Sequence, residues 1–278
     1  MSLPAVIVTY FPDATFFYNL DAIAAQCIEV VVVDNSSGQD PLDTKAFTNV
    51  TVLTQGENIG VAAALNRGLE ELERRGYPYA VLFDQDSCPY PDFAIAMEQA
   101  ATAHMGFSTI GCVYGDVAWD ENLDVKDGCV PIKTVITSGS LVAISAWRRL
   151  QGFREDLFID HVDHEFCLRA RKSGYDVLLA PKARIHHDIG FPELHSFLGK
   201  RVRCSHHAAF RYYYLFRNYL LIFPSLFWTH PKWFVRMGML LIKMLLKSAL
   251  FEADKRDKFC FAMKGILHGI QHVSGKLR

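Results

Sequence analysis

The sequence lacks the cysteine patterns that are typical of zinc sites and disulfide frameworks. Its seven cysteines are an odd number, they are widely scattered, and no two of them form a Cys-x-x-Cys pair. This pattern predicts neither a zinc site nor a disulfide framework, and it is typical of reduced core thiols in a cytosolic protein. The seven are Cys27, Cys88, Cys112, Cys129, Cys167, Cys204 and Cys260.

Two glycine fingerprints are also missing from the 278 residues. No Gly-x-Gly-x-x-Gly follows the first predicted strand, and no Gly-x-x-x-x-Gly-Lys-Ser/Thr occurs anywhere. These absences argue against a Rossmann dehydrogenase, a P-loop enzyme and a sugar-1-phosphate nucleotidyltransferase. The N-terminus lacks the basic start and small-residue cleavage site of a signal peptide, so export is not expected.

Acidic residues are scarce in the last third of the chain. Residues 196–278 contain 15 Lys+Arg and 3 Asp+Glu, whereas residues 1–195 contain 14 and 27, so the net charge of -1 divides into +12 and -13. An acidic body suits cation binding, and a basic, aromatic-rich tail suits an anionic surface. Zinc-finger and aromatic RNP signatures are absent, so no nucleic-acid partner is expected.

The tail also lacks an uninterrupted apolar run long enough to span a bilayer. Residues 211–223 and 233–251 are apolar, but Arg and Lys interrupt both segments. Such helices can lie in the membrane interface, or they can form a helical subdomain that packs on the body or makes a homodimer. Both interpretations stay open at this stage.

What the body does contain is a series of strands separated by helices. Apolar or β-branched runs at 5–9, 30–33, 50–53 and 79–83 alternate with helical patterns at 16–27 and 61–75, and a further helix is predicted at 91–104. Runs this apolar are buried on both faces, as in a parallel sheet. We therefore expect an α/β fold with a Rossmann-like, mostly parallel sheet flanked by helices.

Polar residues follow three of these strands. Thr9, Asp34 and Asp84 each end one, so the carboxyl edge of a parallel sheet would collect them. Asp84 and Asp86, two residues apart on extended chain, can point the same way and reach one divalent cation, or a cation and a ribose. Turn and capping chemistry before Pro89 is the plainer explanation for the same acids.

The middle of the chain predicts strands at 110–114 and 135–137, separated by a polar surface loop at 120–127. Gly139 and Ser140 then precede a short apolar run, where small residues would let backbone approach a ligand, although a tight bend explains them equally well.

A second acidic stretch lies at 160–165, where Asp160, Asp163 and Glu165 occur with two histidines. They precede or begin a predicted helix that ends at Ser173-Gly174, so Asp163 is either a helix cap or a candidate general base. A strand at 175–179 follows, and His186 and His187 come near the end of the acidic body, where an imidazole beside the two carboxylates would complete a site for Mg²⁺ or Mn²⁺.

These pieces together resemble the ordered motifs of inverting family-2 glycosyltransferases with the GT-A fold. The motifs are Val8-Thr9-Tyr10, Asp34-Asn35-Ser36-Ser37, Asn58-Ile59-Gly60 with Asn66, Asp84-Gln85-Asp86, Asp163-x-Glu165 with Arg169, and His187-x-x-Gly190. Several short segments are similar in sequence to bacterial rhamnosyltransferases. They are Phe83-Asp84-Gln85-Asp86-Ser87, Phe158-Ile159-Asp160 and the pairs Tyr212-Tyr213 and Arg217-Asn218. That similarity implies a dTDP-L-rhamnose donor.

The resemblance implies a role for each matching residue. It assigns the nucleotide to Thr9, Tyr10, Asp34, Asn35, Asn58, Arg67, Asp84 and Gln85. It assigns the divalent cation, Mg²⁺ or Mn²⁺, to Asp86, Asp84 and His187, with His186 as the alternative histidine, and the catalytic base to Asp163. Gly139, Ser140, Asp160, Glu165 and Arg169 are expected to bind the acceptor or support the site. The family commonly has Glu-Asp at the base, whereas this chain has Val162-Asp163, so Asp160 or Glu165 would take over the orienting role.

The expected organisation is a catalytic domain at 1–195, with a nucleotide-sugar half at about 1–105 and an acceptor half at about 106–195, and a basic helical region at 196–278. The expected activity is transfer of L-rhamnose from dTDP-L-rhamnose to a glycan or lipid-linked acceptor, by a protein on the inner face of the cell membrane. A donor such as a UDP-hexose or UDP-galactofuranose is the first alternative, and a nucleotide-binding regulatory protein without activity is the second.

Overall fold

The computed structural model describes residues 3–38, 42–114, 128–187, 193–197, 200–204, 207–252 and 254–277. It divides the chain into two compact units. The first consists of Met1–Glu155 and Val162–His187, and the second of Asp156–His161 and Asp188–Arg278. The six residues 156–161, which include Asp160 of the second acidic stretch, thus belong with the C-terminal unit.

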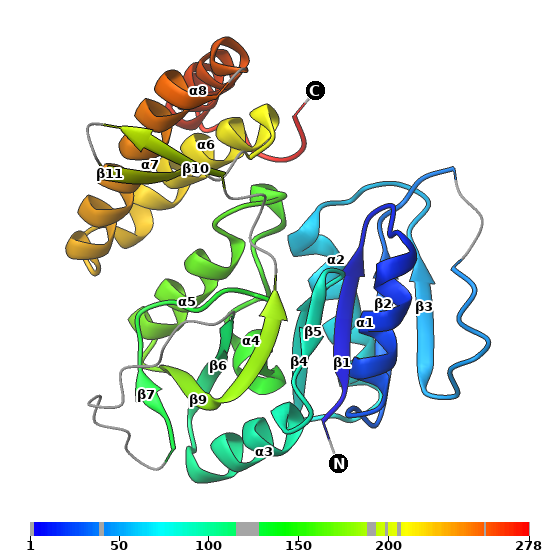
Figure 1. Cartoon of the computed structure of the whole chain (residues 1–278). Coiled ribbons are helices and arrows are strands. Elements are labelled where there is room, and N and C mark those ends of the chain that lie inside the picture. The colour runs from blue at the N-terminus through cyan, green and yellow to red at the C-terminus, as the bar shows by residue number, and fades with distance from the viewer. Residues whose placement is uncertain are drawn as a thin grey trace. The chain divides into compact units, whose positions relative to one another are not determined.

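The first unit is built on a nine-stranded sheet whose strands follow one another in the order β3-β2-β1-β4-β8-β6-β9-β5, with β7 paired to β9 (Figure 1). Six strands run in one direction, and β5, β7 and β8 run against them. The bounds are β1 Ala5–Thr9, β2 Val30–Asp34, β3 Val50–Thr54, β4 Tyr79–Asp84, β5 Ser87–Pro89, β6 Phe107–Tyr114, β7 Val130–Pro131, β8 Ser140–Ala143 and β9 Asp176–His187. The mixed, mostly parallel α/β sheet expected from the sequence is confirmed.

Helices cover both faces of this sheet. Ala5 and Ile7 of β1 share a core cluster with Phe16 of α1 and with α3, whereas Val6, pointing the other way, meets Gly68 of α2. A Cβ at Gly68 would lie 2.3 Å from the Val6 side chain, so α2 approaches the strand as closely as glycine permits. The helices are α1 Ala14–Ala24, α2 Val61–Arg74, α3 Phe93–Ala103, α4 Ile144–Arg149 and α5 Val162–Lys172, with a 3-10 turn, η1, at Glu155–Leu157.

The second unit consists of an antiparallel hairpin and three helices. The hairpin strands are β10 Glu193–Phe197 and β11 Lys200–Cys204, and the helices are α6 Ala209–Leu226, α7 Pro231–Phe251 and α8 Lys255–Ile270. Tyr212 and Phe216 of α6 form a core with Leu241 and Ala262, one from each of the other helices. Within the described ranges, no helix is both long and apolar enough to cross a bilayer.

Three sequence expectations differ from the structure. Residues 135–137 form a loop, not a strand, because Val135 is buried against Gly111 by side-chain packing without joining the sheet. The turn that the sequence offered as an alternative is present at Gln85-Asp86, but it leads into the unexpected strand β5, in which Ser87–Pro89 pairs with the end of β9. The β10-β11 hairpin was not expected in the tail. The polar loop expected at 120–127 lies outside the described residues.

Candidate active site

The pairing of β5 with β9 brings a late histidine to the end of β4. In this antiparallel pair Ser87 faces His187 and Cys88 faces His186. Neighbouring strand residues point to opposite faces, so only one of the two histidines can turn toward the acids. His186 is exposed, whereas His187 is half-buried and its Nδ1 lies 2.9 Å from Ser87 Oγ.

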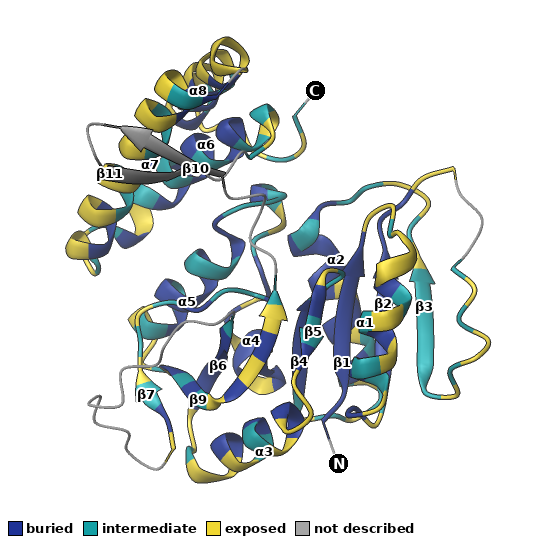
Figure 2. Ribbon diagram, viewed as in Figure 1, coloured by how far each residue is buried: buried dark blue, intermediate teal, exposed yellow. Residues whose placement is uncertain are grey.

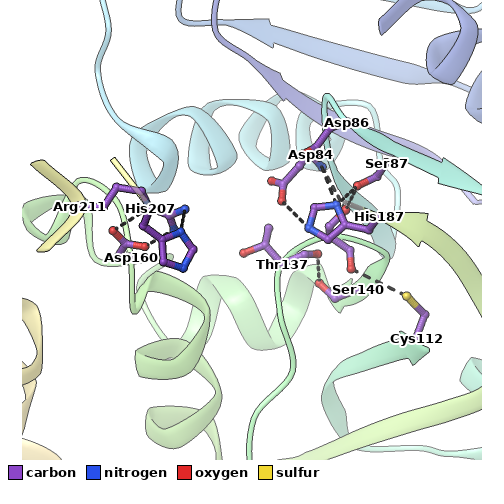
Figure 3. A network of polar contacts seen from close by, with 11 residues as sticks. Asp84, Asp86, Ser87, Cys112, Thr137, Ser140, Asp160, His187, His207 and Arg211 are labelled. Atoms are coloured by element: carbon purple, nitrogen blue, oxygen red, sulfur yellow. Dashed lines mark hydrogen bonds and ion pairs between the residues drawn. The ribbon is translucent and has the colours of Figure 1, made fainter. Parts of the chain in front are cut away.

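His187 meets both acids of the Asp84-Gln85-Asp86 stretch (Figure 3). Its Nε2 lies 3.9 Å from Asp84 Oδ2, and its Nδ1 lies 3.3 Å from Asp86 Oδ1. One donor atom from each residue lies within 4.8 Å of the other two, so the three can hold one metal ion. Carboxylate oxygens with one imidazole suit a divalent cation such as Mg²⁺ or Mn²⁺. About half of the Asp86 side chain is exposed, which leaves this site open to a ligand.

Two serines hold the backbone around these acids. The Asp84 backbone N–H donates to Ser138 Oγ at 3.2 Å, and Ser138 Oγ lies 2.5 Å from Ser87 Oγ. Ser87 in turn contacts His187. No supporting role was predicted for either serine from the sequence. Their contacts depend on the β5-β9 register and on a loop 51 residues away.

The β1-β2 edge presents a buried carboxylate. Because Thr9 pairs with Asp34 across the parallel strands, the Thr9 hydroxyl donates to Asp34 Oδ1 at 2.9 Å. The backbone N–H and hydroxyl of Ser36 donate to the same oxygen at 3.1 and 2.7 Å. Asp34 Oδ2 takes part in none of these three bonds. These bonds hold the Asp34 carboxylate in one orientation. From the sequence, Ser36 was predicted only as a turn residue.

A polar strip continues from this edge toward α2. Asn35 donates through Nδ2 to the Gly60 carbonyl at 3.2 Å, and the Gly60 N–H donates to Asn58 Oδ1 at 2.9 Å. Among the described residues, the buried Asn35 Oδ1 has no hydrogen-bond partner. A buried acceptor of this kind normally finds a partner, so it marks a place for a donor from a ligand or water.

A hydrogen bond between Tyr10 and Gln85 links the end of β1 with the end of β4. The Tyr10 backbone N–H donates to Gln85 Oε1 at 2.7 Å. The Tyr10 side chain is half exposed at this edge. Arg67 is exposed on α2, and its guanidinium lies 3.7 Å from the Glu70 carboxylate. The structure thus links Tyr10 with Gln85, and the nucleotide contact expected of Arg67 stays a prediction.

Asp163 occupies the first turn of α5. Its Oδ1 accepts the backbone N–H of His164 at 2.7 Å, and about a quarter of its side chain is exposed. The residue lines a narrow cavity together with Thr137 and Ser140. This hydrogen bond holds the Asp163 carboxylate at the N-terminus of the helix.

The two neighbouring acids of this stretch, Glu165 and Asp160, each form an ion pair with an arginine. Glu165 forms a two-pronged ion pair with Arg169, at 2.8 and 2.9 Å, and Arg169 also donates to the Gly152 carbonyl. Asp160 belongs to the second unit, where it pairs with Arg211 of α6. The orienting role expected of Asp160 or Glu165 toward Asp163 stays a prediction.

Gly139 has a structural reason for its place beside Ser140. Its φ is +71°, and a Cβ there would lie 2.2 Å from Cys112 Sγ, so no side chain fits. Burial raises the pKa of the Cys112 thiol to about 12, and that of Cys167 to about 12 as well. Both thiols stay protonated at neutral pH, and they are poor nucleophiles and poor metal ligands in that form.

Fold and site together define a class. Solved structures with a similar fold include a mannosyltransferase and TarS, a protein that binds a nucleotide sugar. A mannosyltransferase from Pyrobaculum calidifontis in complex with GDP-Man and Mn²⁺ matches with a TM-score of 0.61 and 16% identity, over 97% of this chain and 87% of that one. TarS 1-349 from S. aureus in complex with UDP-GlcNAc matches with a TM-score of 0.58 and 14% identity, over 98% and 82%. The fold is therefore that of the GT-A glycosyltransferases.

The sequence comparisons indicate which glycosyltransferases this chain is similar to. Residues 5–128 match the model of Glycosyl transferase family 2. Over 291 residues the chain is 28% identical to a dTDP-rhamnosyl transferase, RfbF, from Shigella flexneri, covering 98% of this chain and 95% of that protein. Both comparisons support a glycosyltransferase, and residues 5–128 are the part that is similar to family 2.

Proposed function

We propose that this enzyme transfers L-rhamnose from dTDP-L-rhamnose to a hydroxyl group of a saccharide acceptor, with inversion at the sugar carbon. The observation that carries the proposal is the end-to-end similarity to a dTDP-rhamnosyl transferase, which covers nearly all of both chains. A match of this extent includes the C-terminal unit as well as the family 2 domain. The polar edge at β1, β2 and β4 supplies the chemistry that such a donor requires.

The nucleoside would bind at the β1-β2 edge. The Asp34 carboxylate, oriented through Oδ1 by Thr9 and Ser36, offers Oδ2 as an acceptor for the N–H of a pyrimidine base. The Tyr10 ring provides a flat apolar surface beside it. Asn35 Oδ1, buried and in need of a donor, can accept a ribose or base N–H or O–H group.

Asp84, Asp86 and His187 would hold a divalent cation, since their donor atoms converge and match its preferences. Such an ion, when bound, offsets the charge that develops on the leaving diphosphate. The Mn²⁺ complexes of the Pyrobaculum mannosyltransferase and of GalNAc-T7, which has a TM-score of 0.63 to this chain, support this assignment. Ser87 and Ser138 keep the two acids and the histidine in position.

Asp163 would be the general base. Its carboxylate takes the proton of the acceptor hydroxyl as the new bond forms between that oxygen and the sugar carbon. The bond from the carbon to the diphosphate oxygen breaks in the same step, and dTDP leaves with the electron pair. A single displacement of this kind inverts the sugar carbon, and it needs one base and one counter-charge.

Donor selection tests the proposal. We expect dTDP-L-rhamnose with Mn²⁺ to raise the thermal stability of the purified enzyme, by about 2.7 kcal/mol at 100 times its dissociation constant. When lipid-linked saccharides extracted from bacterial membranes are added as acceptors, the donor should release dTDP, and the acceptors should gain the mass of one deoxyhexose in mass spectrometry. A larger stabilisation and turnover with UDP-GlcNAc or GDP-mannose would overturn the choice of donor while leaving the enzyme class intact.

A further inference from the structure

Helix α7 has two apolar faces, although the second unit buries only one. Trp233, Phe234 and Leu241 are buried against the other helices of the unit, where Phe234 packs on Tyr219 and Phe223 of α6. A second row of large apolar residues faces outward, with side chains 51–62% exposed. Its members are Val235, Met239, Ile242, Leu246 and Leu250.

These five residues form one continuous stripe, which we call the outer stripe of α7. They follow one another at intervals of four, three, four and four residues, the spacing of a single helix face. Figure 2 shows exposed residues recurring along α7 and α8. α8 adds a comparable row of exposed apolar side chains at Phe259, Met263, Leu267 and Ile270. Large exposed apolar patches of this kind usually mark an interaction surface.

A row of basic residues runs along one side of the outer stripe. Lys232, Arg236, Lys243 and Lys247 are exposed and follow at intervals of four, seven and four residues, which places them together on the adjoining part of the helix surface. The sequence of α7 contains no Asp or Glu. Apolar and cationic side chains side by side match the two parts of a phospholipid surface, its acyl chains and its anionic headgroups.

A second copy of this chain is a poorer partner for the same face. In an antiparallel pairing of two outer stripes about a two-fold axis, the basic rows of both copies would lie on the same side and close together, where like charges oppose association. Residues 196–278 hold only three acids to compensate, Glu252, Asp254 and Asp257. Two of these already pair with the buried Lys258.

We propose that the outer stripe of α7 and its basic row dock the enzyme on an anionic phospholipid surface. α7 lies in the interface instead of crossing the bilayer, in agreement with the basic residues that interrupt its apolar sequence. Val235, Ile242 and Leu246 insert among the acyl chains, while the basic row contacts the headgroups. The proposal does not depend on the donor or the acceptor, and it gives the enzyme direct access to acceptors that reside in a membrane.

Vesicle flotation of the full-length enzyme tests this docking. The enzyme should float with vesicles of equal parts phosphatidylglycerol and phosphatidylcholine, and it should stay behind with phosphatidylcholine alone or at high salt. The variant with Arg236→Gln and Lys243→Gln should bind the anionic vesicles roughly 25-fold more weakly, since each basic residue near such a surface contributes about fivefold. The variant with Val235→Gln, Ile242→Gln and Leu246→Gln should bind at least about 100-fold more weakly.

Matched controls come from the first unit. Ile95→Gln with Met105→Gln removes two exposed apolar residues, and Arg149→Gln with Lys182→Gln removes two exposed charges, so both controls should float like the wild type. Thermal melting and dTDP binding should be unchanged in every variant, which separates docking from folding and from the proposed function. Equal flotation of wild type and stripe variant would overturn the proposal. A second result would also overturn the proposal: the wild type sediments as a dimer, the stripe variant sediments as a monomer, and neither protein floats with the vesicles.

Discussion

His186 and His187 are neighbours with opposite surroundings. His186 is exposed, whereas His187 lies 3.3 Å from Asp86 and 3.9 Å from Asp84. We expect His187→Gln to weaken Mn²⁺ binding at least about tenfold, the loss typical when an ordered metal site loses one of its supporting groups. His186→Gln is the matched control and should keep the wild-type affinity. Isothermal titration of Mn²⁺ into both variants measures this, and equal losses in the two would contradict the assignment.

Asp163 is the residue on which the proposed chemistry depends. Removing a general base typically lowers the rate by about 10² to 10⁴, so Asp163→Asn should reduce dTDP release by that factor. Binding of dTDP-L-rhamnose should change little, because Asp163 would contact the acceptor and not the nucleotide. Asp176→Asn removes an exposed carboxylate from the same unit and should leave both quantities unchanged. Substantial transfer by Asp163→Asn would reject this residue as the base.

At the level of elements, the six residues before α5 are held by one pair of side chains on α6. Phe158, Asp160 and His161 all have positive φ angles, between 60° and 67°, which are costly for residues other than glycine. Asn218 Nδ2 lies 2.7–3.0 Å from the carbonyl oxygens of Leu157, Ile159 and Asp160. Buried Arg217 also donates to Leu157 and contacts the Gly275 carbonyl. The pair therefore fixes a strained segment within the second unit.

Removing the amide should release that segment. Asn218→Ala removes the amide that donates to the half-buried carbonyl oxygens of Ile159 and Asp160, whereas the Leu157 carbonyl keeps its bond from Arg217, and each lost bond costs about 1–3 kcal/mol. We expect at least that decrease in the free energy of unfolding, measured by urea denaturation. Gln271→Ala removes a comparable amide from an exposed position in the same unit and should change the stability by less than about 0.5 kcal/mol. A variant as stable as this control would mean that the segment does not need the amide.

The contact between α2 and β1 gives a second prediction at this scale. Gly68→Ala would normally favour a helix by about 1 kcal/mol. Here the new Cβ would lie 2.3 Å from Val6, so we expect a net destabilisation of about 1–3 kcal/mol. Adding Val6→Ala makes room for the methyl group, and the double variant should be less destabilised than the sum of the two single changes. A stabilised Gly68→Ala protein in thermal unfolding would contradict this close packing.

Elements that bury long apolar runs could be predicted from the sequence, and elements that depend on partners could not. Val30 to Val33 cannot face water on either side, so β2 was predictable from composition alone. β5 has only three residues and exists because β9 extends to His187 and pairs with it. The same register decides between His186 and His187, which is why the sequence left that choice open.

For the whole molecule, the charge asymmetry indicated two parts, but not where they separate. In the structure the first compact unit ends at His187, and the domain boundary at about residue 195 that the composition indicated stays a prediction. Asp156–His161 joins the second unit through hydrogen bonds from α6, some 60 residues further along the chain. No local pattern in residues 156–161 reveals such partners, since Phe158-Ile159-Asp160 shows only a similarity to bacterial rhamnosyltransferases.

The central claim is that Asp84, Asp86 and His187 form a cation site that binds the diphosphate of a nucleotide sugar. Isothermal titration of dTDP, with Mn²⁺ and then with EDTA, tests it most directly. The wild type should bind dTDP at least about tenfold more tightly with Mn²⁺, a coupling of about 1.4 kcal/mol, and Asp86→Ala should lose this difference. Equal dTDP affinity of the wild type with and without Mn²⁺ would contradict the account.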